Sequence, residues 1–337
     1  MAEYSKFIPE NTAVRGARRI GIYNKKGNRV GSIPLGPLTK STGEKLYSFG
    51  ALSDVHVQYE TAQADFQRAL GYLNDIEDVA FTCICGDLTA NGTEAELTAY
   101  KDAVDSHSPD TPVYAVFGNH DTYQGLHESA ETYTGQPLCY TFTHENDVFV
   151  MMGIISGYSG AIGTLFTREM LQWLYETLEA NRNNRCFLFQ HILSAKGSGD
   201  GLNIYPYTKL AGDEAAVFES LLSHYHNVIW FHGHSHMAFD LQEKSDLANY
   251  DHVFGCHSVH IPSLAAPRDQ NAAGTGYVNV YGESEGYVVD VYENGIHLRG
   301  RDFVKGEFLP IASYWLDTPL QTVAPGTYTD NTGTIIS

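Results

Sequence analysis

A short apolar run that ends in Gly86-Asp87 is the feature that most constrains the fold of this chain. The run, 81–85, consists of strand-compatible residues, and the turn-forming stretch 89–92 follows soon after Gly86-Asp87. We therefore expect a buried strand that ends at Gly86 and presents the carboxylate of Asp87 at the edge of a sheet. In open α/β sheets, binding sites form at the carboxyl ends of the strands.

The order of the elements around this strand predicts a layered α/β fold. Predicted strands at 47–55, 79–85 and 111–117 alternate with predicted helices near 60–74 and 93–105. Such an order implies parallel strands joined by right-handed crossovers. Further strands and helices follow, and the C-terminal part is mostly β in pattern. We expect two mixed β-sheets packed as a sandwich, with flanking helices outside.

Both ends of the chain are predicted to lie outside this domain. Residues 1–46 are predicted to form an N-terminal β-hairpin extension, because a five-residue, Gly-containing turn at 24–28 separates two strand-like runs. Residues 47–305 form the predicted main domain. Residues 306–337, which include Pro319 and Pro325, are predicted to be an extended C-terminal tail.

The charge balance argues against some classes of partner. The chain has 40 acidic and 21 basic residues and a net charge of −19. Nucleic acids and anionic membranes attract clusters of Lys and Arg, so neither is expected as a partner. Small anionic substrates remain compatible with this charge, because bound metal ions can reverse the local field. The pattern does not indicate an oligomeric state.

Cysteine usage and the N-terminal segment favour an intracellular protein. The five cysteines show no disulfide pattern and are predicted to be small buried side chains. The segment Met1–Phe7 lacks the apolar region of a signal peptide, and no apolar run approaches the about 18 residues of a membrane span. We expect a cytoplasmic protein without a membrane segment.

Five predicted strand ends carry side chains that can bind metal ions. These are Asp54/His56, Asp87, Asn119/His120, His191 and His234/His236. In extended backbone, residues i and i+2 point the same way, so each His-containing i, i+2 pair is expected to converge on one region. Imidazole and carboxylate ligands with one amide oxygen suit Mn, Fe, Zn or Co. One such strand end is weak support for a metal site, whereas five in order, each after an apolar run, predict one.

With these motifs in place, the chain resembles the calcineurin-like metallophosphoesterase superfamily over about residues 47–300. The superfamily motifs D-x-H, G-D, G-N-H-[DE], H and G-H-x-H correspond in order to Asp54-Val55-His56, Gly86-Asp87, Gly118-Asn119-His120-Asp121, His191 and Gly233-His234-Ser235-His236. The resemblance implies that a first metal ion is held by Asp54, His56 and His236. It implies that a second ion is held by Asn119, His191 and His234, and that Asp87 bridges the two.

The resemblance also implies a mechanism. Two cations ~3.5–4 Å apart can clamp an in-line phosphoryl displacement, and a water that bridges them becomes a hydroxide nucleophile near neutral pH. His120, which is not a ligand in the family motif, would protonate the leaving oxygen or stabilise charge on the phosphoryl group. Asp121 would hold the His120 imidazole in the required tautomer, although Asp is also common as a turn or cap residue.

Differences from the motifs of two subgroups indicate which branch of the superfamily this chain resembles. Protein Ser/Thr phosphatases have Asp-Arg-Gly after the bridging Asp, and purple acid phosphatases have a Tyr three residues after it. This chain has no Arg between Leu88 and Gly92, and it has Ala90 at the Tyr position. The form Gly-Asp-Leu-Thr-x-Asn-Gly is most similar to the class III cyclic-nucleotide and glycerophosphodiester phosphodiesterase-like branch.

We therefore predict a dimetal phosphoesterase that hydrolyses small phosphodiesters with two divalent or trivalent ions, Mn, Fe or Zn. A phosphomonoesterase with the same metal core is the nearest alternative. A nuclease is disfavoured by the negative net charge. A binding or scaffold protein that keeps the fold without turnover is the alternative from another class.

Five further residues lie outside the metal motifs. Asn91 and Arg268 are candidates for the substrate site, the latter because its guanidinium can bind phosphate through two donors. A turn former and a surface Arg are the respective alternatives. His232, His257 and His260 match no motif and are predicted to serve packing, although one of the last two could face the site.

Overall fold

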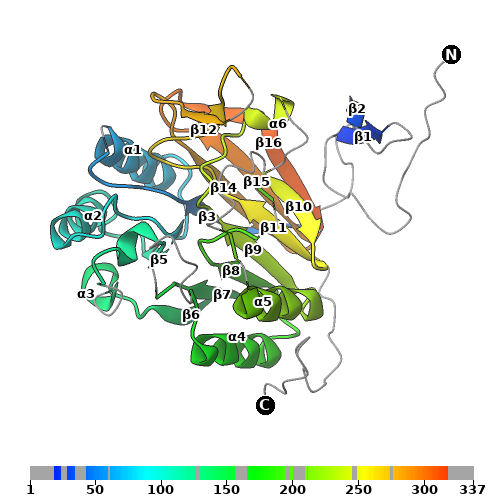
Figure 1. Cartoon of the computed structure of the whole chain (residues 1–337), viewed down its shortest axis with the longest axis horizontal. Helices are drawn as coiled ribbons and strands as arrows, with labels where there is room; N and C mark the ends of the chain where they lie inside the picture. The colour runs from blue at the N-terminus through cyan, green and yellow to red at the C-terminus, as the bar shows by residue number, and fades with distance from the viewer. Residues whose placement is uncertain are drawn as a thin grey trace.

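The computed structural model describes residues 19–23, 29–34, 43–59, 61–125, 130–155, 165–194, 198–199, 209–210, 212–244, 249–273 and 276–317. Two six-stranded mixed sheets dominate it, with helices on their outer faces (Figure 1). The predicted α/β sandwich is therefore confirmed.

The first sheet has the strand order β16-β15-β14-β3-β4-β5. Its strands are β3 (Lys45–Leu52), β4 (Thr82–Cys85), β5 (Val113–Val116), β14 (Glu285–Tyr292), β15 (Gly295–Asp302) and β16 (Glu307–Asp317). The pairs β3–β4 and β4–β5 are parallel, as the β-α-β-α-β order predicts, and the remaining pairs are antiparallel.

The second sheet has the strand order β10-β11-β9-β8-β7-β6. Its strands are β6 (Cys139–His144), β7 (Asp147–Met152), β8 (Cys186–Phe189), β9 (Val228–His232), β10 (Tyr250–Val253) and β11 (Cys256–His260). The four central strands, β7, β8, β9 and β11, are parallel to one another, and β6 and β10 pair antiparallel at the edges. A short two-stranded sheet is formed by β12 (Arg268–Gln270) and β13 (Tyr277–Asn279).

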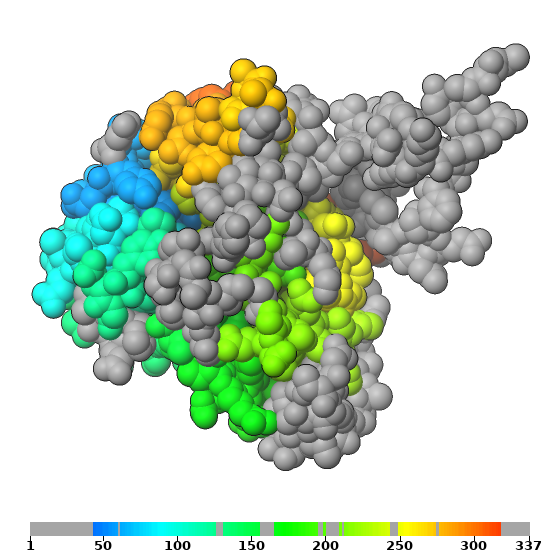
Figure 2. Space-filling view, viewed as in Figure 1, coloured from blue at the N-terminus to red at the C-terminus, as the bar shows by residue number. Residues whose placement is uncertain are grey.

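Helices cover the outer faces of both sheets. The covering helices are α1 (Ala62–Asp75) and α2 (Glu94–His107) on the first sheet and α4 (Arg168–Ala180) and α5 (Gly212–His224) on the second. The shorter elements are α3 (Ala130–Thr134), α6 (Leu241–Lys244) and the 3₁₀ turn η1 (His120–Thr122). Thr93 caps the start of α2, where its Oγ1 accepts a hydrogen bond from Glu96 N at 3.3 Å. The space-filling view shows α1 and α2 (blue to cyan) and α4 and α5 (green) at the surface (Figure 2).

Three layers of apolar side chains join these elements. Between the sheets, Phe49 of the first sheet packs edge-on against Phe149 and Phe187 of the second, with ring centroids 5.3 Å apart in both pairs. Further clusters lie between the first sheet and α1–α2 and between the second sheet and α4–α5. This packing on both faces places the central parallel strands in the core, and their carboxyl ends emerge at one edge.

The chain ends differ in part from the prediction. Strands β1 (Arg19–Tyr23) and β2 (Arg29–Pro34) pair antiparallel, whereas the turn at 24–28 lies outside the described residues. The prediction of an extended tail is wrong for 307–317, because β16 continues the first sheet there. The strand contains Pro310, and a proline is tolerated there because β16 is an edge strand. The domain boundaries themselves stay a prediction.

In the part of the chain that the structure describes, no helix has both the length and the apolar character needed to cross a membrane.

Candidate metal centre

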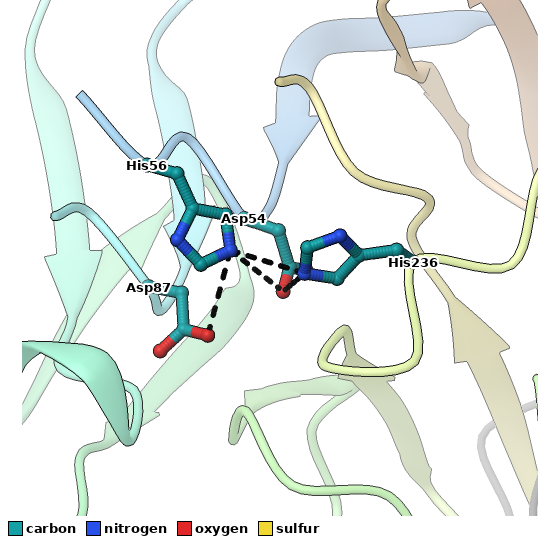
Figure 3. A group of neighbouring side chains, drawn as sticks. All are labelled: Asp54, His56, Asp87 and His236. Atoms are coloured by element: carbon teal, nitrogen blue, oxygen red, sulfur yellow. Dashed lines mark hydrogen bonds and ion pairs between the residues drawn. The ribbon is translucent and has the colours of Figure 1, made fainter. Parts of the chain in front are cut away.

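The predicted ligands meet at the carboxyl ends of five parallel strands. They follow the ends of β3, β4, β5, β8 and β9 by two to four residues. Two buried groups have ligand atoms that all lie within 4.8 Å of one another. The first group is Asp54, His56, Asp87 and His236, and the second is Asp87, His191 and His234. The first group converges from separate loops (Figure 3). Asp87 belongs to both groups, so it lies where a bridging ligand is predicted.

The backbone at these strand ends is not extended, which corrects one part of the prediction. Five ligands have positive φ: Asp54 (53°), His56 (44°), Asp87 (51°), His234 (73°) and His236 (59°). Asp and His are among the few non-glycine residues enriched in this left-handed region, and such residues cluster at functional sites. The i, i+2 side chains therefore converge because both residues of each pair leave the strand in the same unusual conformation.

Glycines in the motifs allow the loops to approach each other closely. A Cβ on Gly118 would collide with Asp87 Oδ1 and with the Asp87 backbone N. A Cβ on Gly233 would collide with the Oγ of Ser53 and the Oδ2 of Asp54. These two glycines thus bring the Asn119 and His234 loops against the two carboxylates.

Each carboxylate is anchored by one oxygen and presents the other to the imidazoles. Asp54 Oδ2 accepts hydrogen bonds from Ser53 Oγ (2.6 Å) and His234 N (3.0 Å), while its Oδ1 lies 2.9 Å from His236 Nε2. Asp87 Oδ1 accepts a hydrogen bond from His120 N (2.9 Å), and its Oδ2 lies 3.1 Å from His191 Nε2. The anchored oxygens fix the orientation in which the second oxygens face the centre.

Backbone carbonyls set the tautomers of four imidazoles. The Nδ1 atoms lie 3.1 Å from Thr89 O for His56, 2.6 Å from Ala90 O for His120, 2.6 Å from Cys85 O for His191 and 3.1 Å from Ala266 O for His236. A carbonyl oxygen only accepts hydrogen bonds, so each Nδ1 carries a proton and the Nε2 of each ring is left to face the centre. The Nε2 atoms of His56 and His236 are 3.0 Å apart. Two facing lone pairs repel unless a cation lies between them, so this arrangement fits a metal ion.

The pKa directions agree with a cation site. Burial disfavours charge on Asp54 and Asp87, yet the surrounding imidazoles, His236 and His191 foremost, hold the pKa of both carboxyls well below the usual range. Burial lowers the pKa of His56 and of His234 to about 3, so both stay neutral and able to bind a metal. Burial opposes charge on His191 too, but Asp87 and Asp54 outweigh it and raise its pKa to about 9. The raised pKa keeps a proton on His191 whose positive charge balances Asp87 and Asp54. A bound cation would supply that positive charge instead.

Asn119 supplies the amide oxygen of the predicted ligand set. Its Oδ1 is buried without a hydrogen-bond partner among the described residues, while its Nδ2 donates to Tyr123 Oη at 3.0 Å. A buried amide oxygen without a partner is costly, and a metal ion would satisfy it. Carboxylate, imidazole and amide donors together fit Mn, Fe or Zn.

We predict that Tyr123→Phe weakens metal binding about tenfold, because loss of the hydroxyl frees the Asn119 amide to rotate. The measurement is the number and affinity of bound Mn²⁺ ions by titration calorimetry. Tyr59→Phe is the matched control: the Tyr59 ring stacks on His56 at 4.7 Å, and its hydroxyl bonds to none of the described residues. Equal affinities for both variants would contradict this role of Tyr123.

The structure corrects the predicted role of Asp121. Its carboxylate accepts hydrogen bonds from Leu88 N (3.1 Å), Thr89 N (2.9 Å), Thr89 Oγ1 (2.8 Å) and Gly118 N (2.8 Å). The His120 ring is held by the Ala90 carbonyl instead, so the prediction that Asp121 sets its tautomer is wrong. Asp121 ties the loop after β4 to the loop after β5, and the loops in turn position Asp87 and His120.

His120 lies beside the two ligand groups. Its Nε2 is 3.9 Å from Asp87 Oδ2, and its side chain is 24% exposed, whereas the side chains of His56 and His191 are fully buried. Its ring also lies 4.6 Å from that of Tyr123. This is a suitable position for contact with a substrate that enters from solvent.

The two candidate substrate residues differ in placement. Asn91 is exposed, and its backbone N and Nδ2 donate to the Glu96 carboxylate at 3.1 and 2.9 Å, which is the expected arrangement of a turn former. Arg268 N donates to His236 O at 2.7 Å, and the Arg268 guanidinium lies 4.4 Å from the Tyr277 ring. Burial and then the charge of Arg268 lower the pKa of His236. The Arg268 Nε donates to Asn279 Oδ1 at 3.2 Å, so the structure ties the Arg268 backbone to the His236 loop and its guanidinium to the β13 side of the hairpin.

Several residues of the centre were not predicted from the sequence. Ser53 and Tyr123 have no motif of their own, although Ser53 directly precedes Asp54 and was available as a candidate. The carbonyl groups of Thr89, Ala90, Cys85 and Ala266 carry no side-chain signal, so only the folded chain reveals them.

Comparisons with known proteins agree with this geometry. The family model of the calcineurin-like phosphoesterases matches residues 47–238, more than half of the chain. No curated protein matches the chain. Among solved structures, it is similar in fold to "GAP50 the anchor in the inner membrane complex of Plasmodium", with 13% identity over 82% of this chain and 90% of that chain and a TM-score of 0.54.

Two further solved structures align with lower TM-scores. A predicted phosphoesterase from Streptococcus pneumoniae is 12% identical, with 80% of this chain and 97% of that chain covered and a TM-score of 0.36. Vacuolar Protein Sorting 29 from Cryptosporidium parvum is 10% identical, with 79% and 96% covered and a TM-score of 0.38.

Proposed function

Because this chain belongs to the calcineurin-like phosphoesterase family, we propose that it is a metal-dependent phosphoester hydrolase that acts on small phosphodiesters. The observation that carries the proposal is the pair of buried ligand groups that share Asp87. A shared carboxylate is the arrangement that two adjacent ions require.

In this proposal, each ion has three ligands of its own and the shared carboxylate. Asp54, His56 and His236 would hold the first ion. Asn119, His191 and His234 would hold the second, and Asp87 would contact both. When bound, the ions would neutralise charge on the phosphoryl group and lower the pKa of an attacking water.

His120 and Arg268 are the residues proposed to act on the substrate itself. The Nδ1–H of His120 is held by Ala90 O, so its Nε2 can carry a proton to the leaving oxygen or donate a hydrogen bond to the phosphoryl group. Arg268, whose backbone N donates to His236 O, would offer guanidinium donors to a phosphate oxygen. We propose His120 as the catalytic acid and Arg268 as a substrate-binding residue.

The choice of a diester rests on the sequence around the shared carboxylate. The segment Gly86–Gly92 has the Gly-Asp-Leu-Thr-x-Asn-Gly form of the class III phosphodiesterase-like branch and lacks the arginine of the protein phosphatases. The net charge of −19 favours a small substrate over a nucleic acid.

The proposal predicts that the Mn²⁺-loaded protein hydrolyses bis-p-nitrophenyl phosphate with a higher kcat/KM than p-nitrophenyl phosphate. His120→Asn is expected to lower kcat by about 10²- to 10⁴-fold while both ions stay bound, since His120 is not a proposed ligand. Release of p-nitrophenol and metal content are measured on the same samples. Preference for the monoester would favour a phosphomonoesterase instead.

A binding or anchoring protein without turnover is the second candidate. The fold likeness to a protein described as an anchor favours it. Six of the seven predicted ligands lie in the two buried groups, and this favours catalysis. If the protein binds two ions and hydrolyses neither ester, the result would favour a binding or anchoring function.

A further inference from the structure

A buried polar network that the proposed reaction does not use lies behind the His234–His236 turn. It links Asn249, which precedes β10, to His260 at the end of β11 and to Ser235. The side chains of Asn249 and His260 are fully buried. Ser235 lies between two proposed metal ligands, so the network ends at the metal centre.

The direction of each hydrogen bond follows from the chemistry of Asn249. Its Nδ2 lies 3.0 Å from Met237 O and 2.9 Å from His260 Nδ1. Met237 O only accepts, which fixes the amide orientation and makes Nδ2 the donor to both atoms. His260 Nδ1 is then an acceptor, and the ring proton resides on Nε2. That Nε2–H donates to Ser235 Oγ at 2.8 Å.

The position of the His260 ring is set on all sides. His260 pairs with His232 across β11 and β9, and the His260 backbone N donates to Asn249 O at 2.7 Å. Gly199 lies so close to the ring that a Cβ there would collide with it. Burial lowers the His260 pKa to about 3, so the ring is neutral, as a donor–acceptor tautomer requires.

The turn that receives this hydrogen bond has an unfavourable backbone conformation. His234 and His236 have φ of 73° and 59°, and Ser235 joins them. Left-handed conformations of non-glycine residues persist only where surrounding contacts hold them. The hydrogen bond from His260 to Ser235 is such a contact, because it comes from β11, which pairs with β9 on one side and β10 on the other.

From this geometry we propose that His260 is a positioning residue: through Ser235, and oriented by Asn249, it holds His234 and His236 in the conformation that binds metal. The proposal rests on the proposed metal-dependent function. It assigns His260 no contact with a metal ion or a substrate.

The test compares three variants of the full chain by Mn²⁺ titration calorimetry and by thermal unfolding with and without chelator. His260→Phe keeps the size of the ring but donates nothing to Ser235, and it is expected to weaken Mn²⁺ binding about 10- to 100-fold. His260→Gln restores an N–H donor and is expected to recover part of the affinity. His257→Phe, on the same strand, is the control and should bind Mn²⁺ as the wild type does.

The difference between the two melting temperatures separates positioning from packing. A purely structural role of His260 would lower the melting temperature equally with and without metal, and that result would overturn the proposal. Under the proposal, the gap between the two temperatures shrinks in His260→Phe and not in His257→Phe. Unchanged Mn²⁺ affinity in His260→Phe would also overturn it.

The same experiment distinguishes failure of the proposed function. Wild-type protein that binds no Mn²⁺ would overturn both the function and the role of His260. Wild-type protein that binds two ions without hydrolysing any phosphoester would overturn the function, while weaker binding by His260→Phe would still support the positioning role.

Discussion

Replacing Asp87 with asparagine is expected to lower kcat/KM for bis-p-nitrophenyl phosphate about a thousandfold, equivalent to about 4 kcal/mol of transition-state stabilisation. The reason is the position of Asp87 Oδ2, which lies 3.1 Å from His191 Nε2, 3.7 Å from His56 Nε2 and 3.9 Å from His120 Nε2. This oxygen therefore faces ligands of both groups. An amide at this place removes the negative charge that both ions need.

The measurement combines steady-state kinetics with metal analysis of the purified variant, which is expected to retain at most one tightly bound ion. Asp105→Asn is the control, because it makes the same change of charge at an exposed side chain of α2 that pairs with Lys101. Activity of Asp87→Asn within a few fold of the wild type would contradict a shared carboxylate at the reaction centre.

Removal of metal by a chelator is expected to lower the melting temperature by roughly 10 °C. An ion present at 1,000 times its Kd stabilises a protein by about 4 kcal/mol, and each kcal/mol shifts the midpoint of a domain of this size by about 2–4 °C. Without cations, the His56 and His236 lone pairs face each other at 3.0 Å, and the Asn119 Oδ1 is buried without a partner. The folded state alone forms this site, so metal binding stabilises it selectively.

Differential scanning fluorimetry before and after chelation, and again after Mn²⁺ is restored, measures this effect. Asp87→Asn should show a smaller difference between the two states, since it lacks the shared ligand. Identical melting curves with and without chelator would show that the buried cluster is stable without metal, and the metal-dependent proposal would lose its basis.

Part of the centre was predictable because its information is local in the sequence. Each predicted ligand follows an apolar run that forms a strand, and the parallel strand order brings these strand ends to one edge. The residue types Asp, Asn and His determine which ligand atoms these side chains can offer to a metal ion. Gly118 and Gly233 accompany them because the loops approach closely.

Other features could be recognised only in the folded chain. The sequence suggested that Asp121 orients His120, but the Asp121 carboxylate binds backbone N–H groups and the Ala90 carbonyl holds the ring instead. The edge strand β16 was not predicted, because its pairing with β15 is a contact that its own residues do not reveal.

The sequence by itself determined the α/β class, the family, and the residues that can bind metal, because each depends on side-chain type and on spacing along the chain. The tertiary structure alone decided the left-handed backbone of the ligands, the tautomers of their imidazoles and the link from Asn249 through His260 to Ser235. The physical reason is that these features depend on backbone carbonyls and on contacts between distant segments. Any residue type supplies a carbonyl, so only its position in space reveals its partner.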